Sequence, residues 1–90
     1  MNVHAVFSPG AKVMVRCTTY HYTGRVQSFD GQWLTLDQCA WIPDSGRWTQ
    51  AIATGDFSEC EPYPSDQPVV INAIHIVDAT TIPKLPTTQK

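Results

Sequence analysis

Hydrophobic and polar residues alternate along three successive stretches in the first half of the chain. The first stretch, residues 12–17, reads KVMVRC and places every second residue, all of them hydrophobic, on one face. This period of two is typical of a half-buried β-strand. Two further strands are expected over residues 20–29 and 32–42, and the dipeptide Asp30-Gly31 between them favours a tight hairpin turn. The pattern therefore predicts an antiparallel meander, in which Leu34 lies on the core face of the third strand.

The period of the hydrophobic positions changes after Pro43, where the third strand is expected to end. Trp48, Ala51 and Ile52 are spaced as on one face of a helix, so a short helix is expected over about residues 46–54. Residues suited to capping flank this segment, namely Asp44 or Ser45 before it and Gly55 after it.

The rest of the chain divides into a loop, a strand and two ends. Residues 56–68 are acidic and contain three prolines, so we expect an exposed loop. Residues 69–77, VVINAIHIV, are rich in β-branched side chains and predict a strand that is broken near Asn72. Residues 1–9 are expected to be a lead-in and residues 83–90 a flexible tail.

These elements predict one domain over residues 1–90, with a core at about residues 12–78. The expected fold is mainly β, a small SH3-like or Sm-like β-barrel of about five antiparallel strands with one short α-helix, and an open roll is the alternative.

Residues 13–36, VMVRCTTYHYTGRVQSFDGQWLTL, resemble the first motif of Sm-like proteins. The likeness lies in the alternating hydrophobic residues, in Gly24 within the second strand and in Asp30 before an apolar strand. Sm-like proteins use an asparagine near this turn to hold a uridine, and Trp33-Leu34 stand in its place here. The resemblance therefore favours the barrel more than binding of RNA.

A second resemblance covers roughly residues 12–86. The motifs VMVR, TGRV, AWIPDSGR, ATGDFSECEPYP and IVDA…LP follow one another in the order found in a group of small, uncharacterised bacteriophage and prophage proteins. This resemblance implies a phage origin and a location in the cytoplasm of the infected bacterial host. It implies no activity and no functional residue.

Charge and hydrophobicity narrow the range of partners. The chain has six Lys and Arg against eight Asp and Glu, a net charge of −2, whereas duplex DNA is usually bound by a dense basic face. No apolar run approaches the roughly 18 to 20 residues that span a bilayer. We therefore expect a protein that binds neither duplex DNA nor a membrane.

The three cysteines, Cys17, Cys39 and Cys60, are odd in number and form no Cys-x-x-Cys pair. Reduced and buried thiols are the simplest interpretation. A zinc site made by Cys17, His21 and Cys39 lacks ligand pairs at the usual short spacings, so no metal or other cofactor is expected.

Catalytic residues are not recognisable in the sequence. No nucleophile has a base at a familiar spacing. The protein is therefore not expected to be an enzyme.

Aromatic and cationic side chains gather on the second expected strand. Tyr20 and Tyr22 share one face of it, whereas His21 and Arg25 share the other. A tyrosine can stack on a base and an arginine fork matches a phosphate, so this hairpin is a candidate surface for an anionic ligand. Alternatively, the tyrosines cover the end of the barrel and Arg25 pairs with Asp37 across the sheet.

The turn AWIPDSGRW, residues 40–48, is a second candidate. It carries Ser45 and Arg47 beside backbone amides that can receive an anion. If the turn folds over the hairpin, Arg25 and Arg47 can share one ligand. The residues expected to bind a ligand are Tyr20, His21, Tyr22, Arg25, Trp41, Ser45 and Arg47.

Three functions are consistent with these observations. The favoured one is a non-enzymatic phage accessory protein, a homo-oligomer that captures a small nucleotide-like anion or a host defence protein. The capture function is an analogy from the phage resemblance. The alternatives are a structural or assembly protein of the virion, active in head completion, the tail or capsid decoration, and an Sm-like RNA adaptor.

Overall fold

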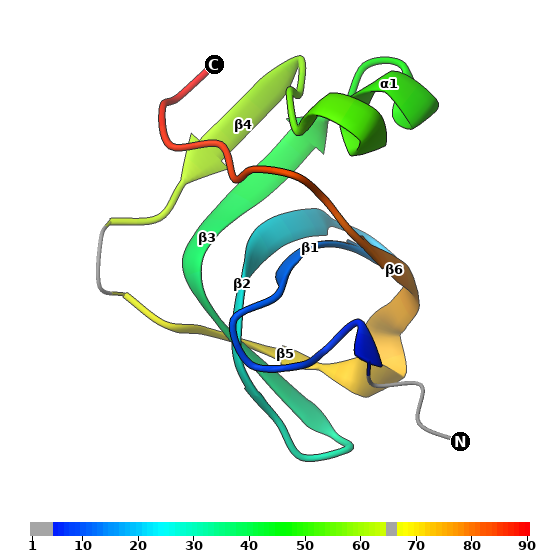
Figure 1. Ribbon diagram of the computed structural model, residues 1–90, viewed down its shortest axis with the longest axis vertical. Coiled ribbons are helices and arrows are strands. Elements are labelled where there is room, and N and C mark those ends of the chain that lie inside the picture. Colours follow the sequence, from blue (N-terminus) through cyan, green and yellow to red (C-terminus); the bar gives the residue numbers. More distant parts are fainter. Residues whose placement is uncertain (1–4, 65–66) are drawn as a thin grey trace.

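One antiparallel sheet organises the part of the chain that the computed structural model describes, residues 5–64 and 67–90 (Figure 1). Its strands follow the order β4-β3-β2-β1-β6, and β5 pairs with β3 outside this path. The strands are β1 (Lys12–Cys17), β2 (His21–Phe29), β3 (Trp33–Asp44), β4 (Glu59–Pro62), β5 (Val69–Asn72) and β6 (Ile76–Thr81). The helix α1 spans Trp48–Thr54, and the 3-10 turn η2 spans Ala73–His75.

The prediction of a mainly β, small barrel-like fold with one short helix is confirmed. The described chain contains six strands where about five were expected, and the sheet does not close into a complete barrel. The additional strand is β4, which lies within the expected loop. The break near Asn72 is also confirmed, because η2 separates β5 from β6 and the Asn72 side chain accepts a hydrogen bond from the Ile74 N–H.

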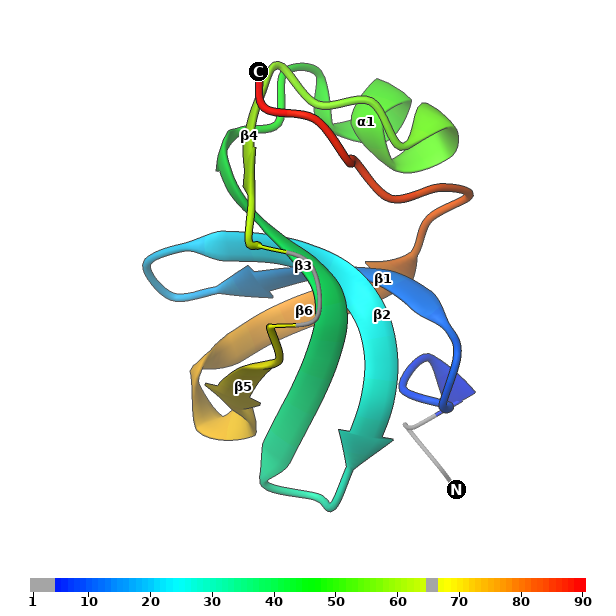
Figure 2. The same cartoon turned by 90° about the vertical axis from the view of Figure 1, so that its left-hand side faces the viewer.

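The long strand β3 bends the sheet. It pairs with β2 on one side, while on the other side its first residues pair with β5 and its later residues with β4. Figure 2 shows β3 running through the molecule with β4 beside one part and β5 beside another. One continuous strand thus joins the two parts of the sheet.

Gly24 allows β2 to lie close to β3. A Cβ atom at this position would lie 2.9 Å from the Leu36 Cβ and 3.2 Å from the Asp37 carbonyl oxygen. The pairing of β2 with β3 is irregular here, between Thr23 and Arg25. The extra residue of this irregularity lies on β3, because Thr23 and Arg25 are two residues apart whereas their partners Ala40 and Asp37 are three apart. The expected alternation along β2 is kept through this point, because the register of β2 with β1 is regular from His21 to Arg25.

Two hydrophobic clusters make up the core. The first lies inside the bent sheet and contains Val13, Val15, Cys17, Val26, Leu34, Leu36, Cys39 and Ile71. The second lies beneath α1 and contains Met14, Ala40, Ile42, Ala51, Phe57, Cys60 and Ile82. Successive residues of β1 therefore enter different clusters, so both faces of this strand are buried.

The start of α1 differs from the prediction. Arg47 is the residue before the helix, and no side chain caps it. Asp44 instead accepts a hydrogen bond from the Gly46 N–H at 2.9 Å, so the expected cap by Asp44 or Ser45 is wrong. The other end is confirmed, because Gly55 is left-handed, with φ 78°, and its N–H donates to Ala51.

The strand β3 continues through Pro43, where we expected it to end. The pairing of β3 with β4 is irregular between Trp41 and Asp44. A proline lacks an N–H, and such an irregularity is one of the places where a strand tolerates it.

The acidic segment and the end of the chain pack together. Phe57 and Cys60 are buried, although they lie in the segment expected to be an exposed loop. Cys60 exchanges backbone hydrogen bonds with Lys90, at 3.2 Å and 3.0 Å. Residues 83–90 therefore lie against the domain instead of projecting as the expected flexible tail.

The lead-in also touches the core in its described part. Phe7 packs on Phe29, with ring centroids 4.9 Å apart. Residues 1–4 of the lead-in and residues 65–66 of the expected loop lie outside the described residues.

The three cysteines are buried and unpaired, as predicted. Burial raises the pKa of the Cys39 thiol to about 12, so this sulfur stays protonated. Within residues 5–64 and 67–90, no group of three His, Cys, Asp or Glu side chains is placed to hold a metal ion. No helix in these residues is long and apolar enough to cross a membrane.

Leu34→Asp should unfold the domain. Leu34 is 0% exposed within the first cluster, so an aspartate there would be buried without a partner. We expect the free energy of unfolding to fall by about 4 kcal/mol or more. Trp33→Ala is the control, because Trp33 precedes Leu34 and is exposed. Urea titration followed by circular dichroism measures both, and a Leu34→Asp variant as stable as Trp33→Ala would contradict the strand register.

Candidate functional site: an aromatic groove

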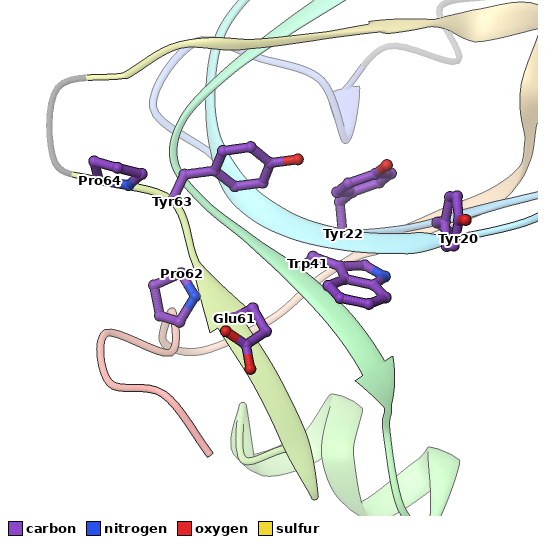
Figure 3. Close-up of a pocket in the computed structure, with 7 residues that line it drawn as sticks. All are labelled: Tyr20, Tyr22, Trp41, Glu61, Pro62, Tyr63 and Pro64. Atoms are coloured by element: carbon purple, nitrogen blue, oxygen red, sulfur yellow. The ribbon is translucent and has the colours of Figure 1, made fainter.

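An open groove of about 430 Å³ is lined by residues of β2, β3 and β4 and of the segments next to them (Figure 3). Four aromatic rings, two prolines and one carboxylate line it. We call it the aromatic groove, and its residues are Tyr20, Tyr22, Trp41, Glu61, Pro62, Tyr63 and Pro64.

The strand register places three of these residues in one row. Tyr22 on β2 is the cross-strand partner of Trp41 on β3, and Trp41 is the partner of Glu61 on β4. Directly opposed residues of antiparallel strands point to the same face and lie close together. Tyr20 extends the row, with its ring centroid 5.8 Å from that of Trp41 at 90°. The sheet itself therefore fixes the floor of the groove.

Tyr63 supplies the opposite wall. It follows β4, and its backbone N–H donates to the Cys39 carbonyl at 2.9 Å. Figure 3 shows its ring extending toward Tyr22. Both rings also pack on the first core cluster, and burial raises the pKa of both phenols. They therefore remain neutral hydroxyls at physiological pH.

The outer rings are exposed to solvent. Tyr20 is 53% exposed and Trp41 is 36% exposed, although both are large aromatic side chains. The exposed faces of these two rings are not packed in the core. Exposed aromatic rings that gather around one hollow are typical of binding surfaces.

Glu61 is the one charged residue among the described residues that line the groove. Its carboxylate accepts a hydrogen bond from Gln89 Nε2 at 3.1 Å. The ion pairs of the described chain join Arg16 to Asp78, Arg25 to Asp37 and Lys84 to Asp56, so Glu61 is in none of them. The groove is thus apolar with a single negative charge.

Arg25 lies outside the groove. Its Nε and Nη2 donate to the two carboxylate oxygens of Asp37, each at 2.8 Å. The structure therefore agrees with the alternative in which Arg25 pairs with Asp37 across the sheet. These hydrogen bonds hold the pKa of the Asp37 carboxyl below its usual value. A phosphate could use the Nε–Nη2 edge of Arg25 only by displacing Asp37.

The remaining predicted residues lie elsewhere. Ser45 and Arg47 line a separate polar depression beside α1, together with Ser58 and Lys90. His21 is at the start of β2, and its Nδ1 is buried without a hydrogen-bond partner among the described residues. Of the seven predicted residues, the groove brings together Tyr20, Tyr22 and Trp41.

Four groove residues were missed by the sequence analysis, namely Glu61, Pro62, Tyr63 and Pro64. They follow in sequence as EPYP, inside the segment that we expected to be an exposed acidic loop. A tyrosine held between two prolines was the available signal, because the prolines restrict the backbone on both sides of it.

Comparison of this chain with protein-family models, with curated protein sequences and with solved structures gives no match. The function must therefore be inferred from the residues of the chain itself.

Asp37→Asn should lower stability near neutral pH but not in acid. A carboxyl whose pKa is lowered in the folded state stabilises it above the unfolded pKa, about 3.9, and this contribution is lost as the pH falls through the folded value. We therefore expect the melting temperature of wild type to approach that of Asp37→Asn below about pH 4.

Glu59→Gln is the control for this experiment, because Glu59 is exposed and is in no ion pair of the described chain. Thermal melts between neutral pH and about pH 3 compare the three proteins. If the melting temperatures of wild type and Asp37→Asn differ by the same amount at neutral pH and at about pH 3, the ion pair of Asp37 with Arg25 is not the cause of that difference.

Proposed function

We propose that the protein is a non-enzymatic phage accessory protein that captures a host protein by holding an extended segment of it in the aromatic groove. The phage origin rests on the sequence resemblance. The binding function is supported by one observation, the gathering of Tyr20, Tyr22, Trp41 and Tyr63 around a single open groove.

The composition of the groove suits a polypeptide segment. Tyrosine and tryptophan provide large rigid contact areas with few rotatable bonds, and they dominate the binding energy of many interfaces. Grooves lined by aromatic rings commonly bind extended, proline-containing segments, which lose little conformational freedom on binding. A volume of about 430 Å³ accommodates a few side chains of such a segment.

The charge of the groove favours a protein over a nucleotide-like anion. An anion would meet the carboxylate of Glu61 and no basic side chain among the described lining residues. Arg25, the cation expected to hold it, does not line the groove, and its Nε and Nη2 are bound to Asp37. Of the two ligands considered from the sequence, the host protein is therefore better supported.

Self-association is the second part of the proposal. Val70, Ile74 and Val77 are 55%, 79% and 64% exposed and lie on β5, η2 and β6 in succession. The strand β6 is also the last of the sheet, so one of its edges has no partner strand within the described chain. Exposed apolar side chains beside an open edge favour pairing with another copy in a chain this small.

Trp41→Ala should weaken the capture of peptides. A random library of 12-residue peptides is selected against the purified protein, and the enriched peptides are titrated by fluorescence anisotropy. We expect Trp41→Ala to weaken the binding of these peptides at least about tenfold, because a central aromatic residue contributes well over 1 kcal/mol to an interface.

Trp33→Ala is the matched control, since Trp33 is an exposed tryptophan of the same strand that does not line the groove. It should bind these peptides like wild type. A library without enriched peptides, or equal binding by Trp41→Ala and wild type, would refute the proposal.

Ile74→Asp should convert an oligomer into monomers. Ile74 is 79% exposed, so the folded monomer tolerates a charge there, whereas an apolar contact between copies does not. Light scattering coupled to gel filtration should give wild type a mass well above 10.0 kDa and Ile74→Asp a mass near that value. A wild-type monomer at tens of micromolar would contradict self-association.

A further inference from the structure

The chain holds one of its own arginines between an indole ring and a carboxylate. The Cζ atom of Arg16 lies 4.4 Å from the centroid of the Trp48 ring. Its Nε donates to Asp78 Oδ1 at 2.8 Å, and its Nη2 contacts Asp78 Oδ2. The ring face attracts the cation, and the carboxylate matches the Nε–Nη2 edge of the guanidinium. Trp48 and Asp78 thus show how this protein binds a guanidinium at its surface.

The aromatic groove contains the same two chemical groups, an indole and a carboxylate, but no cation among its described lining residues. Trp41 and Glu61 are directly opposed on β3 and β4, so the indole and the carboxylate belong to one row. None of the described residues that line the groove is basic, and Glu61 is in no ion pair of the described chain. The amide of Gln89 occupies one acceptor site of the carboxylate, which can accept several hydrogen bonds.

We propose that the aromatic groove binds an arginine side chain of the captured segment, with its guanidinium against Trp41 and Glu61 as its counter-ion. The inference rests on the proposed function and specifies its ligand. Tyr22, the neighbour of Trp41 on β2, adds a second ring to the site. Each ring attracts a cation through the negative charge of its face.

Arginine fits this site better than lysine. A guanidinium is planar, so it can stack on a ring while its edge donates two parallel hydrogen bonds to one carboxylate. An ammonium is a strongly hydrated point charge, which loses more hydration at a flat aromatic surface. The groove is open, so a bound guanidinium keeps part of its contact with water and its desolvation costs little.

The experiment compares a cation with its neutral isostere. N-acetyl-arginine amide and N-acetyl-citrulline amide are titrated into ¹⁵N-labelled protein, and the signal of the Trp41 indole N–H is followed by NMR. Citrulline has nearly the shape of arginine but no charge. We expect the arginine compound to bind at least about fivefold more tightly, from the size of one cation–π contact and one exposed ion pair.

Glu61→Gln should reduce this preference at least about twofold, because it removes the counter-ion and keeps the shape. Glu59→Gln is the matched control, since Glu59 lies on the same strand, is exposed and does not line the groove. It should retain the wild-type preference. Equal binding of the two compounds, no change of the Trp41 signal with either at tens of millimolar, or an unchanged preference in Glu61→Gln would overturn the inference.

The peptide library separates this inference from the proposed function. Peptides that bind in the groove and keep their affinity when each arginine is replaced by citrulline would overturn the arginine site but leave segment capture intact. If the protein prefers the arginine compound but no peptide is enriched from the library, segment capture is refuted and the arginine site is supported.

Discussion

The structure depends on one constraint, that β3 must pair with three other strands. Its neighbour β2 lies on one side, while β5 and β4 share the other. Such a strand must bend between its two partners, and β2 can follow the bend because Gly24 places no side chain against Leu36. The two core clusters result from this bend, since the first fills the inside of the sheet and the second lies where α1 covers the part that β4 extends.

The same bend creates the aromatic groove. Trp41 lies on the part of β3 that pairs with β4, so Tyr22 and Glu61 flank its side chain, which stays 36% exposed. Two arginines of the sheet are paired outside the groove, Arg25 with Asp37 and Arg16 with Asp78. These pairs leave Glu61 as the carboxylate of the groove. The electrostatic character of the site therefore follows from pairings made elsewhere on the sheet.

Much of the fold could be predicted because it depends on local patterns. Alternation placed Leu34 and Leu36 in the core, and Gly55 marked the end of α1. The strand β4 was missed because Cys60 and Phe57 stand among acidic residues and prolines, which hide a short buried strand. One side of the groove could be predicted, because Tyr20 and Tyr22 are close in sequence. The other side could not, because Tyr63 reaches them only through the pairing of β4 with β3.

The wall of the groove is linked to the end of the chain. Lys90 pairs with Cys60, and Gln89 donates to Glu61, so the last residues hold β4 from its outer side. A four-residue strand at the edge of a sheet has few hydrogen bonds of its own, and its position depends on such contacts. The tail also occupies the backbone groups of Cys60 that would otherwise be open to pairing with another chain. The geometry of the groove is therefore coupled to the docking of residues 83–90.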